Sequence, residues 1–286
     1  MDDLQWRARV AGLLYGLAGS TAPFAYLYVP RLLLVQGDAG ATADRVRASE
    51  GLLRAAIFCE LSGATLLVFA ALALYGLFES VDRKTSTLMA AMMLVSVPIS
   101  YVNALIHLAP IVLLGGPTVA SPGEVTGQVA FFLRLHSHGV VVDQILWGLW
   151  LFPIGVLVVK SGFIPRWLAY PLFLAGAGYV LNSLGTLLLP ATLRWSTDHL
   201  QILGVGELPF FSFFLLIWGV RGRAVDRLAA LLVLVLFAER MASTGLLLSN
   251  RIDPTQYAAL TLASLVVVFA LVVRWRSTMR AARAGT

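Results

Sequence analysis

Several carboxyl and imidazole side chains of this chain lie inside long apolar runs, where they could carry out acid–base chemistry. Glu60 and Glu207 are the best candidates for proton exchange, because a carboxyl group buried in an apolar site can hold a proton near neutral pH. His136 and Asp143 are seven residues apart, so they share one helix face at a separation of about 10.5 Å along the axis. We predict these four as the catalytic residues, with Asp143 orienting a histidine of another helix, such as His107.

A second set of polar and aromatic residues is predicted to line a ligand site. Asn103 and His107 are four residues apart and therefore share one helix face. Glu239 and Arg240 are adjacent, so they diverge by about 100° around the helix and need different partners. Arg240 is expected to neutralise Glu60 or Glu207. The predicted ligand-binding residues are Asn103, His107, Trp147, Tyr179, Asn182, Glu239 and Arg240.

The sequence predicts no metal ion and no other cofactor. Cys59 is the single cysteine, which excludes an intrachain disulfide and any cysteine-based cluster. His136 and His138 point to different sides of a regular helix, so the "HSH" stretch is not a two-ligand chelate. A zinc or iron site would have to combine His107, His136 and a carboxylate from separate helices, and no HExxH or Glu-x-x-His pair supports one.

The elements that position these residues are predicted to be membrane-spanning helices. Hydrophobic residues make up 59% of the 286 residues, charged residues only 13%, and the mean hydropathy is +0.83. A soluble domain carries about 25% charged residues. Eight apolar runs are each near or above the roughly 20 residues that cross a bilayer, at about 10–34, 52–78, 86–114, 129–159, 167–189, 200–220, 228–249 and 256–273. We predict an all-α polytopic bundle, with residues 1–286 forming one membrane-embedded unit.

The distribution of the basic residues predicts how this bundle is oriented. With the N-terminus in the cytoplasm, thirteen of the 21 Lys and Arg residues fall in inner segments and seven in outer segments, which favours two cytoplasmic termini in a plasma (inner) membrane. The formal charge of +6 therefore reflects topology, and we expect no nucleic-acid partner. Residues 37–51 are predicted to form a short surface helix with Thr42 as its cap.

The intramembrane polar residues are predicted to form one layer. Counted from the outer helix ends, Glu60, Asn103, His107, His136, Asn182, Glu207, Glu239 and Arg240 lie at similar depths, with Asp143 somewhat deeper. Most are about 10–16 Å below the end of their helix at 1.5 Å per residue. Because such groups are costly in lipid, they should face one another or a wet cavity. The inner half is expected to be almost purely apolar.

Several stretches resemble a known family. They include "RVAGLLYGLAG", "LVSVPISYVNAL", "WLFPIGVLVVKSGFIPR" and "GELPFF". The chain is similar over residues 6–222 to the bacterial integral-membrane family catalogued as domain of unknown function 4386. The resemblance implies a core of six spans over 6–222, with two additional C-terminal spans over 223–286. His136 and Glu207 fall on motif positions of the family, whereas His138 stands where an aromatic residue is expected. The family implies no activity.

Three functions are compatible with these features. The first is an outer-half pocket that binds a lipophilic small molecule, isoprenoid or lipid-like, and transforms it by acid–base chemistry. The second is a transporter or exporter of a small lipophilic compound, which the absence of a clear internal repeat disfavours. The third is a structural or partner-binding membrane protein without catalysis. The sequence leaves the choice open, as it does the oligomeric state; the expected partners are membrane lipid and the lipophilic molecule.

Overall fold

The computed structural model describes residues 3–116, 121–190, 207 and 211–219, and all regular elements in these ranges are helical. This confirms the predicted all-α class. Contacts divide the chain into two compact units, Met1–Gly222 and Arg223–Thr286, and the fold below belongs to the first. The predicted spans at 228–249 and 256–273 lie outside the described residues, as does most of the run at 200–220. One bundle for the whole chain therefore stays a prediction.

Five helical segments in the described part of the chain are long and apolar enough to cross a membrane. They coincide with the first five apolar runs. The first combines α1 (Asp3–Ser20), the π-helical η1 (Pro23–Tyr28) and α2 (Val29–Leu33), and the last combines η2 (Arg166–Leu168) and α7 (Ala169–Leu188). Between them lie α4 (Glu50–Phe78), α5 (Arg83–Gly115) and α6 (Pro122–Ser161). The eight-span count and the orientation stay predictions.

Local signals in the sequence explain where the long helices begin and end. The Asp82 side chain caps α5 by accepting a hydrogen bond from the backbone N–H of Thr85. Ser121 and Glu124 form a reciprocal capping box at the start of α6, which satisfies backbone donors that the first helical turn leaves free. Gly162 ends α6 at φ +68°, a left-handed conformation that glycine adopts without a Cβ clash.

The turn after α2 contains the predicted short helix, α3 (Ala39–Ala48). The expectation that Thr42 caps it is wrong, because the Asp38 side chain accepts the capping hydrogen bond from the N–H of Ala41 at 2.8 Å. Thr42 lies one turn further on and is buried. Its hydroxyl donates to the backbone oxygen of Asp38 at 2.8 Å and accepts from the N–H of Val35 at 3.0 Å. Thr42 therefore fastens α3 to the end of the first span.

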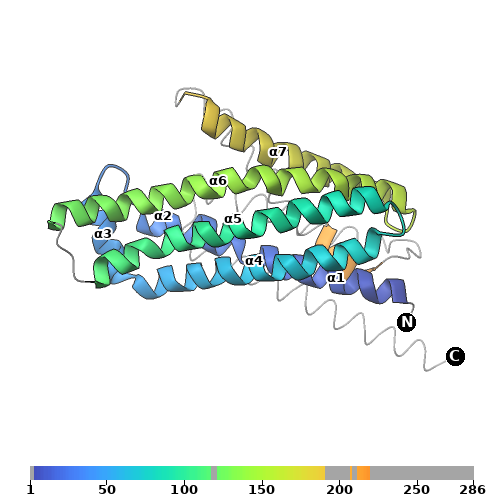
Figure 1. Cartoon of the computed structure of the whole chain (residues 1–286), viewed down its shortest axis with the longest axis horizontal. Helices are drawn as coiled ribbons and strands as arrows, with labels where there is room; N and C mark the ends of the chain where they lie inside the picture. The colour runs from blue at the N-terminus through green and yellow to red at the C-terminus, as the bar shows by residue number, and fades with distance from the viewer. Residues whose placement is uncertain (1–2, 117–120, 191–206, 208–210, 220–286) are drawn as a thin grey trace. The chain divides into compact units, whose positions relative to one another are not determined.

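The helices pack in chain order, with α1 against α4, α4 against α5, α5 against α6 and α6 against α7. Figure 1 shows α4, α5 and α6 running side by side, while α7 crosses α6 at an angle. A short helix, α10 (Phe213–Ile217), packs on α1. Helices α6 and α7 approach closely at Gly148 and Gly176, where a Cβ on either would collide with the carbonyl oxygen of the other. Small residues permit such backbone contact in membrane bundles.

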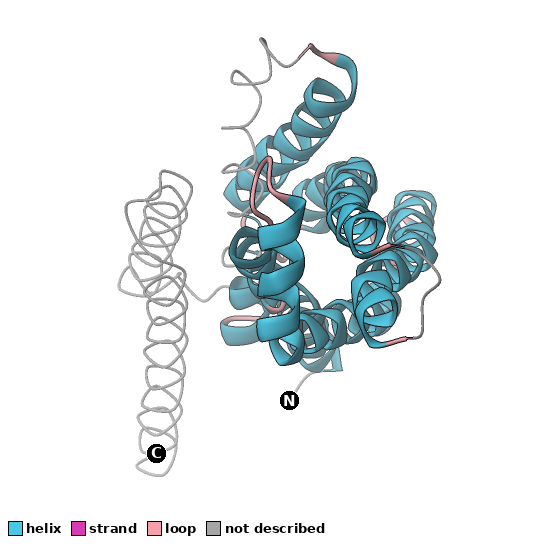
Figure 2. Cartoon of the chain, turned by 90° about the vertical axis from the view of Figure 1, so that its left-hand side faces the viewer, coloured by secondary structure: helices cyan, strands magenta, loops and turns pink. Residues whose placement is uncertain are grey.

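The bundle has two ends, which are named by their landmarks. The α3 end, which faces the viewer in Figure 2, holds Leu33, Glu50, Gly115 and Pro122. The Asp82 end holds the α4–α5 turn and the last turn of α6, where the Lys160 ammonium contacts the Asp82 carboxylate at 2.6 Å. In the predicted orientation the α3 end is the outer one. Both ends have buried apolar cores, with Leu33 and Leu53 at the α3 end and Leu77 and Met89 at the Asp82 end.

Candidate functional site

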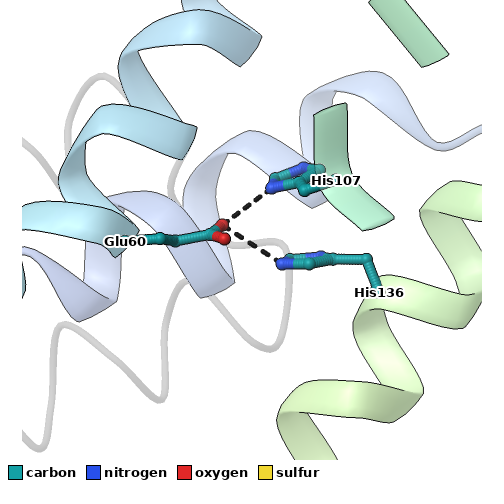
Figure 3. A group of neighbouring side chains, drawn as sticks. All are labelled: Glu60, His107 and His136. Carbon is teal, nitrogen blue, oxygen red and sulfur yellow. Dashed lines mark hydrogen bonds and ion pairs between the residues drawn. The ribbon is translucent and has the colours of Figure 1, made fainter. Parts of the chain in front are cut away.

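Three ionisable side chains from three helices meet inside the bundle. Glu60 of α4, His107 of α5 and His136 of α6 are 3%, 0% and 1% exposed. The Nδ1 atom of His107 lies 2.7 Å from Glu60 Oε1, and the Nε2 atom of His136 lies 3.1 Å from the same oxygen (Figure 3). These three residues are called the Glu60 group below. One carboxylate oxygen thus faces a nitrogen from each of two imidazole rings.

Helix pairing positions the Glu60 group. Helices α5 and α6 run antiparallel, so that His107 meets His136 and, seven residues away on each helix, Ser100 meets Asp143. The two imidazole rings stack with centroids 3.7 Å apart and an interplanar angle of 16°. Both histidines therefore turn an edge toward α4, where Glu60 extends to meet them (Figure 3).

The Glu60 group contains polar atoms that the described residues do not satisfy. Glu60 Oε2, His107 Nε2 and both ring nitrogens of His136 are buried, and no described side chain or backbone group forms a hydrogen bond with them. Leaving a buried polar atom unpaired costs about 1–3 kcal/mol, so native proteins rarely accumulate such atoms. Four of them in one group are the strongest sign in the described part of the chain that this place has a role besides packing.

A row of aromatic rings extends from His136 toward the middle of the bundle. Tyr26 of η1 stacks on His136 with centroids 6.2 Å apart and contacts Trp147 at 5.5 Å. Trp147 in turn meets Tyr179 of α7 edge to face at 6.0 Å. Trp147 and Tyr179 were predicted to line a ligand site, and the structure places them in one row with His136. Tyr26 was missed; the nearest sequence signal is Pro23, which begins the π-helical turn that carries it.

Asp143 belongs to a separate contact. Its Oδ2 accepts a hydrogen bond from the Ser100 hydroxyl at 2.6 Å. The prediction that Asp143 orients His107 is wrong, because Glu60 holds that histidine and Asp143 lies two helical turns deeper, as its distance from His136 along α6 requires. The role of Ser100 was missed, since a single serine in an apolar run carries no signal of its own.

Glu207 lies in a third cluster, the Glu207 network. The Tyr15 hydroxyl donates a hydrogen bond to Glu207 Oε1 and accepts one from the Trp150 indole N–H at 3.0 Å. Phe211 packs edge to face on Tyr15. Trp150 is fourteen residues beyond His136 on α6, or about 21 Å of helix. The predicted single layer is therefore wrong for Glu207, because α1 and α6 hold it much closer to the Asp82 end.

The remaining predicted residues are partly accounted for. Asn182 donates a hydrogen bond to Gln144 Oε1 at 2.8 Å, which joins α7 to α6. Asn103 packs against Gly139, one turn from the Glu60 group, where a Cβ would collide with its amide. His138 is exposed, and its Nδ1 lies 2.9 Å from the Arg134 backbone oxygen, so it is separate from His136 as expected. Glu239 and Arg240 lie outside the described residues, so the predicted pairing of Arg240 is untested.

Within the described part of the chain, the Glu60 group is also the arrangement that could hold a metal ion. One ligand atom from each residue can be chosen so that all three lie within 4.8 Å of one another. Imidazole nitrogen and carboxylate oxygen are ordinary ligands of zinc and iron. The sequence predicted that a metal site would need His107, His136 and a carboxylate from separate helices, and the structure brings such a set together. The expectation that no metal is bound stays untested.

Comparisons with known proteins point to a family without an assigned activity. An uncharacterized protein of Archaeoglobus fulgidus is 37% identical over 82 residues, which cover 27% of this chain and 44% of that protein. The match thus spans less than half of the relative. No solved structure matches the chain. The model of the family described as "Domain of unknown function (DUF4386)" matches residues 10–219, and the chain therefore belongs to that family, as the resemblance implied.

Proposed function

We propose that this membrane protein binds a lipophilic small molecule, isoprenoid or lipid-like, beside the Glu60 group and transforms it by acid–base chemistry. The observation that carries the proposal is the meeting of Glu60, His107 and His136 inside an apolar bundle, with one carboxylate oxygen 2.7 and 3.1 Å from the two ring nitrogens. Placing ionisable groups inside a membrane costs free energy, so a function explains why three of them meet here better than packing does.

The geometry suits proton transfer. A general acid or base must lie within hydrogen-bond reach of its proton partner, and the Glu60 carboxylate and the His107 imidazole meet that condition for each other. The unpaired Glu60 Oε2 and His136 Nδ1 offer further positions at which a ligand can exchange a proton. For an isomerisation, the group would add a proton to one carbon of a double bond and remove a proton from the saturated carbon attached to the other end of that bond, so that the double bond shifts by one position.

The surroundings suit a lipophilic ligand. The aromatic row of Tyr26, Trp147 and Tyr179 adjoins His136 and provides flat apolar faces. On the outer surface of α5, a groove of about 440 Å³ is lined by apolar residues on both sides of His107 in sequence, including Leu105, Leu108, Ala109 and Val112, together with Phe132 of α6. A hydrocarbon tail in this groove would lie at the same depth as the Glu60 group.

A second candidate function is a proton-coupled exporter of a small lipophilic compound. It is favoured by the spacing of His136, Asp143 and Trp150, which lie seven residues apart on one face of α6. These polar side chains lead from the Glu60 group to the Glu207 network. Successive positions are about 10.5 Å apart along the helix. Proton movement along them would therefore need water between the side chains, which the acid–base proposal does not require.

Deuterium incorporation tests the first function while the substrate is still unidentified. Purified protein supplied with lipids from its own membrane is incubated in D2O, and the lipid extract is analysed by mass spectrometry. We expect one extractable compound to gain carbon-bound deuterium. Glu60→Gln should lower that rate at least about 100-fold, within the range that general acid–base catalysis contributes. His138→Gln, which changes an exposed histidine on the same helix as His136, should leave the rate unchanged.

Two results would overturn this proposal. If no lipid compound gains deuterium and none co-purifies with the wild-type protein, the site does not act on a lipophilic molecule. If a co-purifying compound instead accumulates in vesicles in response to a pH gradient, and Glu207→Gln abolishes the accumulation while no deuterium is incorporated, the protein is an exporter.

A further inference from the structure

We infer that Glu60, His107 and His136 form a binding site for one divalent transition-metal ion, with Zn²⁺ as the best fit. The inference names a cofactor for the Glu60 group. Its catalytic meaning rests on the function proposed above, whereas the metal binding itself does not. Three observations carry it: the convergence of three ligand atoms, the chemistry of the donors, and the buried atoms that lack partners.

The convergence is close to what a metal ion requires. Zinc binds imidazole nitrogen at about 2.0–2.1 Å and carboxylate oxygen at about 2.0–2.2 Å, which in a tetrahedral site places ligand atoms about 3.3 Å apart. In the structure, Glu60 Oε1 is 2.7 Å from His107 Nδ1 and 3.1 Å from His136 Nε2. To coordinate one ion, the contact between Glu60 Oε1 and His107 Nδ1 would have to lengthen by about 0.6 Å, and the two stacked imidazole rings would have to tilt so that both nitrogens face the ion.

The donor set selects the kind of ion. Magnesium and calcium prefer sites made entirely of oxygen ligands, so a group with two imidazoles disfavours them. Two neutral imidazoles and one carboxylate suit zinc, and they leave a divalent ion with one net positive charge in the apolar bundle. Three protein ligands also leave a fourth position open, as in catalytic zinc sites.

The state of the ligand atoms is consistent with this role. His107 would bind the ion through Nδ1 and His136 through Nε2, so the proton of each neutral ring would move to its other nitrogen. His136 Nε2 is itself buried without a hydrogen-bond partner among the described residues, and a bound ion would satisfy it. Glu60 Oε2, which likewise lacks a partner there, could turn toward the ion as a second carboxylate oxygen. With an ion bound, Glu60, His107 and His136 would serve as its ligands, and a water on the ion would take over the proton exchange proposed above for the group.

The experiment uses the full chain, purified in detergent, stripped with a chelator, and titrated with Zn²⁺ and separately with Co²⁺. We expect one Zn²⁺ per chain by elemental analysis and a rise in thermal stability as Zn²⁺ is added, because an ion that binds only the folded state stabilises it. Co²⁺ should give the intense visible absorption of a four- or five-coordinate site. Glu60→Gln and His136→Gln should each weaken Zn²⁺ binding by more than the roughly 10–100-fold that loss of an outer hydrogen-bond partner of a metal ligand costs.

Two control variants test whether the loss of Zn²⁺ binding is specific to the Glu60 group. His138→Gln removes an exposed histidine two residues from His136, and Glu207→Gln removes a buried carboxyl outside the group; both should keep the Zn²⁺ stoichiometry of the wild type. If the variants of the Glu60 group fail to fold, the absorption of wild-type Co²⁺ protein decides instead. A weak, six-coordinate spectrum, or no saturable spectrum at all, would overturn the inference.

The outcomes separate the metal site from the proposed function. Wild-type protein that binds no Zn²⁺ or Co²⁺, yet still shows Glu60-dependent deuterium incorporation, would refute the metal site and leave the acid–base proposal standing. Stoichiometric Zn²⁺ lost in Glu60→Gln, with no lipophilic compound bound or altered, would support the metal site and refute the proposed function. Zn²⁺ retained in both Glu60→Gln and His136→Gln would place the ion elsewhere and refute the inference.

Discussion

The Glu60 group and the Glu207 network both bury a glutamate among helices, but they surround it with different chemistry. Glu60 faces two imidazoles, each of which can gain, lose or relocate a proton. Glu207 faces the Tyr15 hydroxyl, which is itself held by the Trp150 indole N–H. A hydroxyl and an indole are neutral donors that need no change of charge to satisfy a carboxyl group. The first arrangement is suited to the proton exchange proposed above, whereas the second is suited to holding three parts of the chain together.

The two regions also differ in how completely they are satisfied. In the Glu207 network the Tyr15 hydroxyl both donates and accepts a hydrogen bond, and the second carboxyl oxygen, Glu207 Oε2, is the atom left without a partner among the described residues. In the Glu60 group every one of the three residues retains such an atom. Buried polar groups that are satisfied contribute rigidity, and unsatisfied ones are expensive. We infer from this difference that the Glu60 group serves a function, whereas the Glu207 network serves the stability of the fold. The predictions below test that division.

The largest expected effect separates the two glutamates by activity. Glu60→Gln should lower deuterium incorporation into the lipophilic substrate at least about 100-fold, because the amide cannot exchange a proton as the carboxyl group does. Glu207→Gln should change the rate by less than about tenfold, since the amide can still accept a hydrogen bond from Tyr15. Initial rates of both variants at equal protein concentration measure the difference. Equal losses in the two variants would erase the distinction between the two regions.

The next effect concerns stability, which a change in the Glu207 network should lower while the activity stays the same. Tyr15→Phe removes one hydroxyl and with it both hydrogen bonds of the Glu207 network. Because hydrogen bonds between membrane helices average about 0.6 kcal/mol each, we expect a loss of about 1–2 kcal/mol in the free energy of unfolding. Titration with a denaturing detergent measures it. Deuterium incorporation by folded Tyr15→Phe protein should stay close to wild type, and a large drop would mean that the network also takes part in the chemistry.

The sequence predicts the features that depend on residues close together in the chain, but not the contacts between different helices. The apolar runs predict the five described spans, and the four-residue spacing of Asn103 and His107 predicts one buried face of α5, because both features depend only on local helix geometry. Which carboxylate meets His107 depends on how α4, α5 and α6 are rotated and offset against one another. That information is long-range, and it is why Asp143 was expected where Glu60 stands.

The position of Glu207 shows the same limit in another form. Counting from the end of an apolar run assumes that each run begins at the same membrane depth. The partners of Glu207 are Tyr15 of α1 and Trp150 of α6, both far from the α3 end. Neither aromatic residue could be recognised as a partner from the sequence, because aromatic residues in apolar runs are usually core or interface residues. The seven-residue spacing of His136, Asp143 and Trp150 was the available signal that polar contacts continue along the middle of α6.

Two glycines on α6, Gly148 and Gly139, allow the effects of an added Cβ on stability and on activity to be compared. In Gly148→Ala the new Cβ meets the backbone oxygen of Gly176, which cannot move without shifting α7. We expect a cost of about 1–3 kcal/mol, as for other overpacked sites, offset by up to about 1 kcal/mol of helix propensity. In Gly139→Ala the atoms nearest the new Cβ belong to the end of the Asn103 side chain, which can rotate away, so the free energy of unfolding should change less. Because Asn103 is one turn from His107, Gly139→Ala should instead lower the activity of the Glu60 group. Denaturation and rate measurements on both variants should give opposite rankings, and the same ranking in both assays would contradict the division.

The smallest effect is expected at the Asp82 end, far from the Glu60 group. The hydrogen bond from the Lys160 ammonium, together with those from Thr85, holds the pKa of the Asp82 carboxyl well below its usual range. A depressed folded-state pKa stabilises the protein above the unfolded value, near 3.9, and that contribution is lost as the pH falls through the folded value.

Asp82→Asn keeps a side chain that can cap α5 but removes the charge that Lys160 contacts. Its melting temperature should therefore be slightly below that of the wild type at pH 7, and the gap should narrow as the pH is lowered below about 4. The pair is exposed to solvent, and such pairs contribute little. For the same reason the variant should leave the Glu60 group untouched: an Asp82→Asn protein with altered Zn²⁺ binding would show that the Asp82 end and the Glu60 group are coupled through α5.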